Sequence, residues 1–218
     1  LRVSGATVMQ ATPTTWRLLR QVGWKPDTRF KAVCGGEALD EDLAQWLRAT
    51  VARAWNAYGP TETTIWSSLS EIVSVGQPTI GRPIAGTCMY VLDASRGRVP
   101  VGVVGEIFIS GLGLARGYRG RPDLTDQSFL VHPFAPGERI YRTGDLGRWR
   151  ADGALEYLGR GDQQIKLRGQ RIELAEIEAV IRRDANVRNV GVVVRGEGDG
   201  ARLIAYVVVE RPEPLLER

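Results

Sequence analysis

The sequence predicts an α/β protein in which a parallel α/β layer comes first, a small β-barrel-like subdomain follows, and a small α+β lobe comes last. Three observations support this prediction. Short apolar runs alternate with helical patterns up to about residue 70, Gly and Pro separate short β-rich runs after Trp66, and a hairpin, a helix and a second hairpin follow Gly161. We therefore expect a large region at residues 1–160, divided into an α/β layer (about 1–70) and a β-rich subdomain (about 71–160), and an incomplete mobile lobe at 161–218.

The α/β layer is predicted from strands and helices that alternate along the chain. The expected elements are a strand at Thr7–Met9, a helix through Thr14–Leu19 opened by Pro13, a strand at Phe30–Cys34, a helix from the N-cap Asp40 through Arg53, and a buried strand ending near Ala57. Leu43, Leu47 and Val51 are spaced four residues apart and mark one face of the second helix. This alternation favours a parallel sheet.

The remaining elements are shorter. In the β-rich subdomain we expect strands at Thr87–Leu92 and Glu106–Ser110, a helix at Pro122–Phe129, a strand at Ile140–Arg142 capped by Thr143–Asp145, and a hairpin over Trp149–Leu158 that turns at Ala151–Gly153. The polar segment Gly159–Asp162 is the expected domain boundary. Beyond it we expect a strand at Gln163–Leu167, a turn at Gly169-Gln170, a helix marked by Leu174, Ile177 and Ile181, and strands at Asn189–Arg195 and Arg202–Val209.

Composition narrows the functional class. The chain is 43% hydrophobic and 25% charged, as in globular proteins, and has no apolar run long enough for a membrane span. The net charge is only +4, and acidic residues interrupt the basic stretch Arg139–Arg171, so we expect no nucleic-acid partner. Cys34 and Cys88 have apolar neighbours, which predicts buried thiols in a reducing, cytoplasmic compartment. His132 is the only histidine, so no Cys/His metal cluster is expected.

The stretch Asn56–Thr64 carries residues suited to ligand binding. It begins at the end of an apolar run, and Gly59-Pro60 then forces a turn. Three threonine hydroxyls and the carboxylate of Glu62 follow at once. Polar groups at the carboxyl edge of an α/β sheet often bind a ligand, and a carboxylate is a hard ligand that Mg2+ accepts beside phosphates.

Three further motifs follow this stretch. They are YRTGDL at Tyr141–Leu146, GRGDQQIKLRG at Gly159–Gly169 and RIELAEIE at Arg171–Glu178. In this order and at these separations, the four motifs resemble those of the adenylation domains of nonribosomal peptide synthetases, members of the superfamily of adenylate-forming enzymes. The resemblance extends from Met9 to Val209. Gly111–Tyr118 resembles the family's glycine-rich GLARGY segment, for which we expect a structural role.

The resemblance implies an enzyme that uses ATP and Mg2+ to activate an amino acid as aminoacyl-AMP. The acyl group would then pass to the phosphopantetheine thiol of a peptidyl carrier domain, after the small lobe rotates about a hinge. A condensation domain of the same assembly line would be a further partner. In this reaction the protein must align two anions, the substrate carboxylate and ATP, neutralise their charge and exclude water.

The resemblance also assigns roles to individual residues. For the sugar and phosphates of the nucleotide, it implies that Asp145 binds both ribose hydroxyls and that Arg160 contacts the ribose and a phosphate. For the adenine, it implies that Tyr58 and Tyr157 line the base. It also implies that the backbone of Gly35 and Gly36 contacts the base, with Asn56 nearby. For the chemistry, Thr61 matches an α-phosphate contact and Glu62 the Mg2+ ligand. Asp162 matches the hinge, and Lys166 lies in the hairpin that would face the carrier domain.

Six positions resemble those that line the amino-acid side chain: Gln10, Ala32, Cys34, Ala57, Ile65 and Trp66. None is charged, and a charged substrate buried without a partner would be costly, so we expect an uncharged substrate. The bulk of Trp66 favours a small one such as glycine.

The chain departs from the family pattern at both ends. The family's phosphate loop and the aspartate that binds the substrate's amino group would precede Leu1, and its catalytic lysine would follow Arg218. Because these groups are missing, and because the first residue is not Met, we expect a piece that is truncated at both ends and inactive or nearly so by itself.

Two alternatives stay open. One is an acyl-CoA synthetase or another adenylate-forming enzyme outside peptide synthesis, although the motifs at Asn56–Glu62 and Arg168–Glu173 look closer to the peptide synthetases. The other is a non-catalytic module that docks a carrier protein through its small lobe. A nucleic-acid binder is more distant, since no stacking aromatics punctuate the basic stretch.

Overall fold

A computed structural model describes residues 5–73, 76–162, 164–167, 170–196 and 201–210. The chain divides into two compact units, Leu1–Asp162 and Gln163–Arg218, which are described separately. Within the described residues, no helix is both long enough and apolar enough to cross a membrane.

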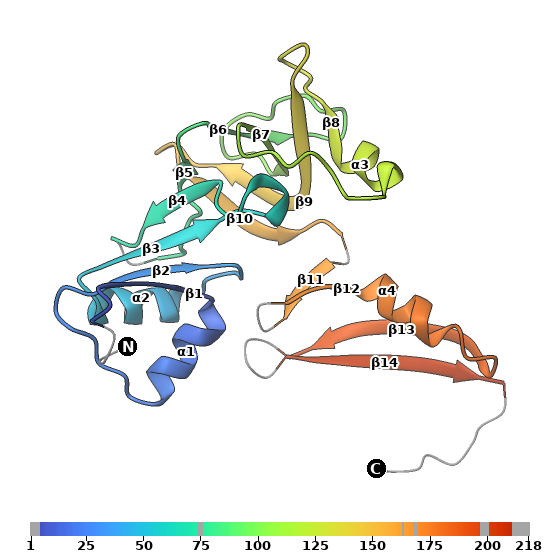
Figure 1. Cartoon of the computed structure of the whole chain (residues 1–218), viewed down its shortest axis with the longest axis horizontal. Helices are drawn as coiled ribbons and strands as arrows, with labels where there is room; N and C mark the ends of the chain where they lie inside the picture. Colours follow the sequence, from blue (N-terminus) through green and yellow to red (C-terminus); the bar gives the residue numbers. More distant parts are fainter. Residues whose placement is uncertain (1–4, 74–75, 163, 168–169, 197–200, 211–218) are drawn as a thin grey trace. The chain divides into compact units, whose positions relative to one another are not determined.

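The first sheet of the larger unit contains the predicted strand–helix alternation. Strands β1 (Val8–Ala11), β2 (Lys31–Gly35) and β3 (Arg53–Tyr58) are parallel and adjacent in that order, connected by α1 (Pro13–Gln21) and α2 (Glu41–Thr50). Figure 1 shows both helices on the same side of the sheet. Two antiparallel strands that we did not predict, β4 (Ser68–Glu71) and β5 (Arg82–Pro83), complete this sheet, which therefore extends past residue 70.

The second helix is shorter than predicted. Asp40 is its N-cap, and the carboxylate accepts a hydrogen bond of 2.7 Å from the backbone N–H of Leu43, as the sequence indicated. The prediction that the helix runs through Arg53 is wrong. Val51 is the C-cap in an extended conformation, and Arg53 pairs with Lys31 as the first residue of β3. Parallel pairing with β2 therefore ends the helix one turn early.

The second sheet is antiparallel. Its order is β10 (Leu155–Arg160), β9 (Arg139–Trp149), β7 (Gly105–Gly111) and β6 (Thr87–Leu92), and β8 (Phe129–Val131), which follows α3 (Pro122–Ser128), also pairs with β9. Its core contains Met89, Val91 and Ile107. The side chain of Cys88 points away from Met89 and Val91, because neighbours on a strand face opposite sides, and it is exposed. The prediction of two buried cysteines is therefore correct for Cys34 and wrong for Cys88.

Thr143–Asp145 do not cap a short strand, as predicted, but form a bulge inside the long strand β9. Glu106 pairs with Leu146 and Phe108 with Arg142, so three residues of β9 lie opposite the single residue Ile107. The Thr143 hydroxyl donates to the Ile107 carbonyl oxygen at 2.7 Å. A bulge changes the direction of nearby side chains, and here it directs Asp145 into the protein, where it is 3% exposed.

The smaller unit is an α+β arrangement. A short hairpin of β11 (Gln164–Leu167) and β12 (Gln170–Glu173) leads into α4 (Leu174–Ile181), and β13 (Val187–Arg195) then pairs with β14 (Arg202–Val209). Leu174, Val190 and Val192 form its core. We predicted this order of hairpin, helix and hairpin, although without bounds for the strand β12.

Candidate nucleotide and amino-acid site

The candidate site lies at the carboxyl edge of the parallel strands. Gly35 ends β2 and is followed by Gly36, and Tyr58 ends β3. The Tyr58 ring leaves the first sheet and packs in the core of the second, with Ile80 and Ile107. Tyr58 therefore joins the α/β layer to the β-rich subdomain.

A buried network surrounds Asp145. The hydroxyl of Tyr58 donates to Oδ2 of Asp145 at 2.5 Å, and Nη1 of Arg160 donates to Oδ1 at 3.0 Å. The side chains of Asp145 and Arg160 are only 5% and 12% exposed. Burial, followed by the nearby charge of Asp145, raises the pKa of Tyr58 well above its ordinary value, so the hydroxyl remains a donor at neutral pH.

Arg160 also holds Asp162. Its Nε and Nη2 donate to the two oxygens of Asp162 at 2.7 and 2.6 Å, so one guanidinium bridges the expected ribose-binding and hinge carboxylates. A Cβ on Gly144 would lie 2.6 Å from both Nη2 of Arg160 and Oδ2 of Asp162, and the φ of Gly144 is +75°. Glycine is therefore required at this position. Asp162 is the last residue of the larger unit, and the side chain of Lys166 lies outside what the structure describes.

The two tyrosines predicted to line the adenine lie together. The ring centroids of Tyr58 and Tyr157 are 6.0 Å apart and their planes are tilted by 41°. Asn56, which the resemblance also predicts near the adenine, is buried, and its amide donates to the Thr79 carbonyl oxygen at 2.8 Å. This bond ties β3 to the loop before β5, so Asn56 has a structural role in addition to any contact with a ligand.

Thr61 and Glu62 lie on a single 3-10 turn, Thr61–Thr63, directly after β3. Thr61 is exposed, whereas Glu62 is 5% exposed. The hydroxyl of Tyr118 donates to Oε1 of Glu62 at 2.6 Å. Tyr118 is a site residue that we did not predict beyond the structural role of its glycine-rich segment, because it is 56 positions from Glu62 in the sequence.

The six predicted pocket residues do not share one surface. Ala32 and Cys34 are fully buried against α1 and α2, whereas we predicted that they line the substrate pocket. Between β1 and β2, Gln10 pairs with Val33, and between β2 and β3, Gly35 pairs with Ala57. These residues lie on the face of the sheet opposite α1 and α2, which we call the helix-free face. Since side chains alternate along a strand, the β2 residues beside Gln10 and Ala57 are Val33 and Gly35, each one position from the predicted residue.

Trp66 closes the carboxyl end of this helix-free face. A Cβ on Gly35 would lie 2.6 Å from Cη2 of Trp66 and 2.4 Å from the Ala57 carbonyl oxygen, so the indole rests directly on the Gly35 backbone. Ile65, immediately before it, is 62% exposed and has a φ of +71°. A positive φ is rare for a β-branched residue and marks a strained turn between Glu62 and Trp66.

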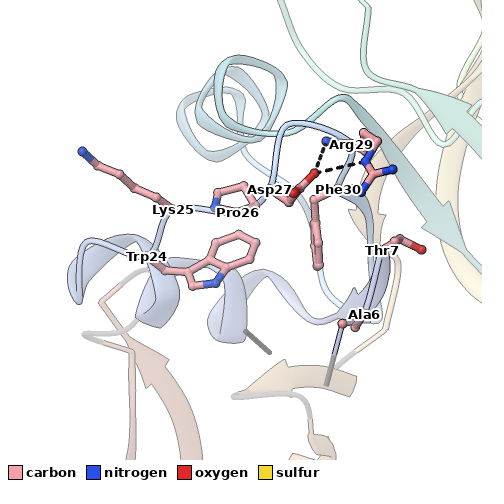
Figure 2. Close-up of a pocket in the computed structure, with 9 residues that line it drawn as sticks. Ala6, Thr7, Trp24, Lys25, Pro26, Asp27, Arg29 and Phe30 are labelled. Atoms are coloured by element: carbon pink, nitrogen blue, oxygen red, sulfur yellow. Dashed lines mark hydrogen bonds and ion pairs between the residues drawn. The ribbon is translucent and has the colours of Figure 1, made fainter. Parts of the chain in front are cut away.

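A cavity of about 390 Å³ lies elsewhere, beside residues that precede β1 and β2 (Figure 2). Trp24 and Phe30 contribute rings, and the charged Asp27 and Arg29 pair with one another. Because it lies at the amino edge of the parallel strands, it is separate from the motif residues at the carboxyl edge.

Comparison with known proteins identifies the family of the chain. The family of AMP-binding enzymes matches residues 1–119. The chain is 50% identical over 207 residues to a dimodular nonribosomal peptide synthase of Bacillus subtilis (strain 168), and 47% identical over 220 residues to the phosphinothricin tripeptide synthetase PhsB of Streptomyces viridochromogenes. These alignments cover 93% and 95% of the chain, but 9% and 18% of the two relatives.

Two solved structures are also similar. One is holo-AB3403, a four-domain nonribosomal peptide synthetase bound to AMP and glycine, with 45% identity and a TM-score of 0.72 over 98% of this chain and 16% of that one. The other is holo-PA1221, which contains adenylation and PCP domains and is bound to a vinylsulfonamide inhibitor, with 29% identity and a TM-score of 0.84 over 96% of this chain and 38% of that one. The chain therefore belongs to the AMP-binding enzymes and, within them, to the adenylation domains of nonribosomal peptide synthetases.

Proposed function

We propose that the protein carrying this chain activates a small, uncharged amino acid as aminoacyl-AMP and passes it to a carrier-protein thiol. The observation that carries the proposal is the buried Asp145 carboxylate, which Tyr58 and Arg160 hold at the carboxyl edge of the sheet. A carboxylate accepts several hydrogen bonds, so it is suited to the two hydroxyls of a ribose. The rings of Tyr58 and Tyr157 beside it provide an apolar surface for the base.

The same residues support charge neutralisation around the phosphates. Arg160 is always protonated and directs its guanidinium toward the ribose-binding carboxylate, where it can also contact a phosphate. Glu62 and the hydroxyl of Thr61 lie one turn beyond Tyr58. The reaction joins an oxygen of the substrate carboxylate to the α-phosphorus of ATP and breaks the bond between that phosphorus and the pyrophosphate. The role of these side chains is therefore alignment and electrostatic stabilisation.

Glu62 fits a role as a magnesium ligand. Among the described residues, no three His, Cys, Asp or Glu side chains gather into a metal cluster. Magnesium in nucleotide enzymes is commonly held by one or two carboxylates together with substrate phosphates, so a single buried carboxylate suffices. When bound, Mg2+ would neutralise negative charge on the phosphates.

A small substrate is supported by Trp66. Its indole rests on Gly35, which lies on the face that also carries Gln10 and Ala57, and a bulky ring there reduces the space for a substrate side chain. The four-domain synthetase that is 45% identical to this chain is bound to AMP and glycine. We therefore propose glycine as the first substrate to test.

The family also suggests the partners. We propose a peptidyl carrier domain bearing phosphopantetheine and a condensation domain of the same assembly line, since the related PA1221 contains adenylation and PCP domains. Both cysteines are free thiols, which favours action in the reducing cytoplasm. The lobe beyond Asp162 would rotate about this residue between the two half-reactions, with Lys166 on the side facing the carrier.

The test is ATP–pyrophosphate exchange by the complete protein with each of the twenty amino acids and with fatty acids. We expect exchange with glycine or another small uncharged amino acid, and a loss of at least about a hundredfold in Asp145→Ala, because a bound ligand hydroxyl would lose a charged acceptor. Arg20→Ala, which removes an exposed ion pair between α1 and Asp42 of α2, is the control. Exchange with fatty acids alone would indicate an acyl-CoA synthetase, and no exchange in the wild type would favour a non-catalytic docking module.

A further inference from the structure

The turn that carries Glu62 is held by the glycine-rich segment Gly111–Tyr118. The backbone N–H of Ala115 donates to the Glu62 carbonyl oxygen at 2.8 Å, and the Thr64 hydroxyl donates to the Gly113 carbonyl oxygen at 2.7 Å. Arg139 in turn donates to two carbonyl oxygens of the same segment, at 2.9 and 3.0 Å. The segment is thus fixed on both sides, and its position determines that of the turn.

Tyr118 extends this support to the Glu62 side chain. Its hydroxyl lies 2.6 Å from Oε1 of Glu62, while its backbone N–H donates to the Thr125 hydroxyl at 2.9 Å. Its ring meets Phe129 edge-on at a centroid distance of 5.7 Å. The ring is therefore held by packing, and the hydroxyl has a defined position from which to bond the carboxylate.

We propose that Tyr118 is a positioning residue that orients the Glu62 carboxylate for Mg2+; this inference rests on the proposed function. A charge-assisted hydrogen bond to one carboxylate oxygen fixes the plane of the group and hence the direction of the other oxygen. Residues behind a metal ligand commonly control metal affinity in this way.

The test is calorimetric binding of ATP to the complete protein, with Mg2+ present and with the metal removed by chelation. In Tyr118→Phe, we expect ATP affinity with Mg2+ to fall about tenfold, the loss typical of a missing outer-shell partner, while metal-free ATP binding stays within about twofold of the wild type. A purely structural role would weaken both affinities alike. Tyr90→Phe is the matched control, because the ring of Tyr90 packs against His132, Phe134 and Arg98, none of which belongs to the Glu62 turn or to the glycine-rich segment.

Hydrogen exchange without ligand supplies a second readout. In Tyr118→Phe, we expect faster amide exchange within Thr61–Thr64 and unchanged exchange in α2, which verifies that the protein is folded. The inference is overturned if Tyr118→Phe loses metal-free and Mg2+-supported binding equally, or if Mg2+ gives the wild type no gain in ATP affinity. Because neither readout uses an amino acid, failure of the proposed adenylation is detected separately by pyrophosphate exchange.

Discussion

The hydroxyl of Tyr58 lies 2.5 Å from Oδ2 of Asp145, although 87 positions separate the two residues in the sequence. Tyr58 ends a parallel strand of the first sheet, and Asp145 lies in the bulge of β9 in the second. The bond therefore joins the α/β layer to the β-rich subdomain at the point where we propose that the nucleotide binds.

Removing this hydroxyl should weaken both the fold and nucleotide binding. In Tyr58→Phe, the buried Asp145 loses one donor, and we expect a loss of about 1–3 kcal/mol in the free energy of unfolding. We also expect the KM for ATP in pyrophosphate exchange to rise. Tyr157→Phe keeps the neighbouring ring and leaves the Asp145 contacts of Tyr58 and Arg160 intact, so it should change both quantities much less. Equal effects of the two substitutions would contradict the importance of the Tyr58 bond.

The pKa of Tyr58 predicts a loss of stability in alkali. The folded protein holds the hydroxyl proton more tightly than the unfolded chain, in which tyrosine titrates near pH 10. The stabilisation is thus complete below about pH 10 and is lost as the pH rises further. Urea unfolding between pH 8 and 11 should show a smaller decline in Tyr58→Phe than in the wild type. A decline of equal slope would show that another group is responsible.

The two cysteines should differ sharply in reactivity. Cys34 is fully buried, and burial raises its pKa to about 12, whereas Cys88 is exposed on β6. Only a thiolate reacts rapidly, so iodoacetamide at pH 8 should modify Cys88 and leave Cys34 intact until the protein unfolds. Mass spectrometry of digested protein, with Cys88→Ser as control, measures this directly. Early modification of Cys34 would place it on an accessible surface after all.

Trp66 should limit substrate size. In Trp66→Ala, the space above Gly35 opens, and we expect the specificity for valine relative to glycine to rise by about tenfold or more, because even one methylene group accommodated in a pocket carries discrimination of this size. Trp46→Ala is the matched control, since Trp46 packs against the helical core on the other face of the sheet. The measurement is kcat/KM in pyrophosphate exchange. Unchanged selectivity in Trp66→Ala would remove Trp66 from the substrate pocket.

The strained turn should offer a gain in stability. Ile65 has a φ of +71° and is 62% exposed. Its backbone strain is therefore offset by little burial of its side chain. Asparagine tolerates this conformation better, and Ile65→Asn should raise the free energy of unfolding by about 1 kcal/mol. Ile84→Asn, at a partly exposed isoleucine without a positive φ, should give no gain. A destabilised Ile65→Asn would show that the side chain makes contacts worth more than the strain.

Local signals in the sequence were sufficient for much of the fold. Asp40 and Pro13 marked the starts of both helices in the first sheet, because capping and a fixed φ depend on neighbouring residues alone. The range Thr87–Leu92 was predicted correctly as a strand. The motifs also identified the family, since each is a contiguous run of residues.

Three features could be known only from the tertiary structure: the end of α2, the bulge in β9, and the face of the sheet to which each β2 side chain points. Alternation predicts that neighbours on a strand point in opposite directions, but it does not say which set faces the helices. Only pairing with β1 and β3 places Cys34 in the core and Val33 beside Gln10. A shift of one residue reverses the face, which is why two pocket residues were misplaced.

The sequence by itself determined the family, the order of most strands and helices, and the candidate residues for the chemistry, because these depend on residue type and short-range spacing. The tertiary structure alone decided which of those residues meet. The bond between Tyr118 and Glu62 and the network around Asp145 join positions far apart in the chain, and such contacts form only when separate strands pack together.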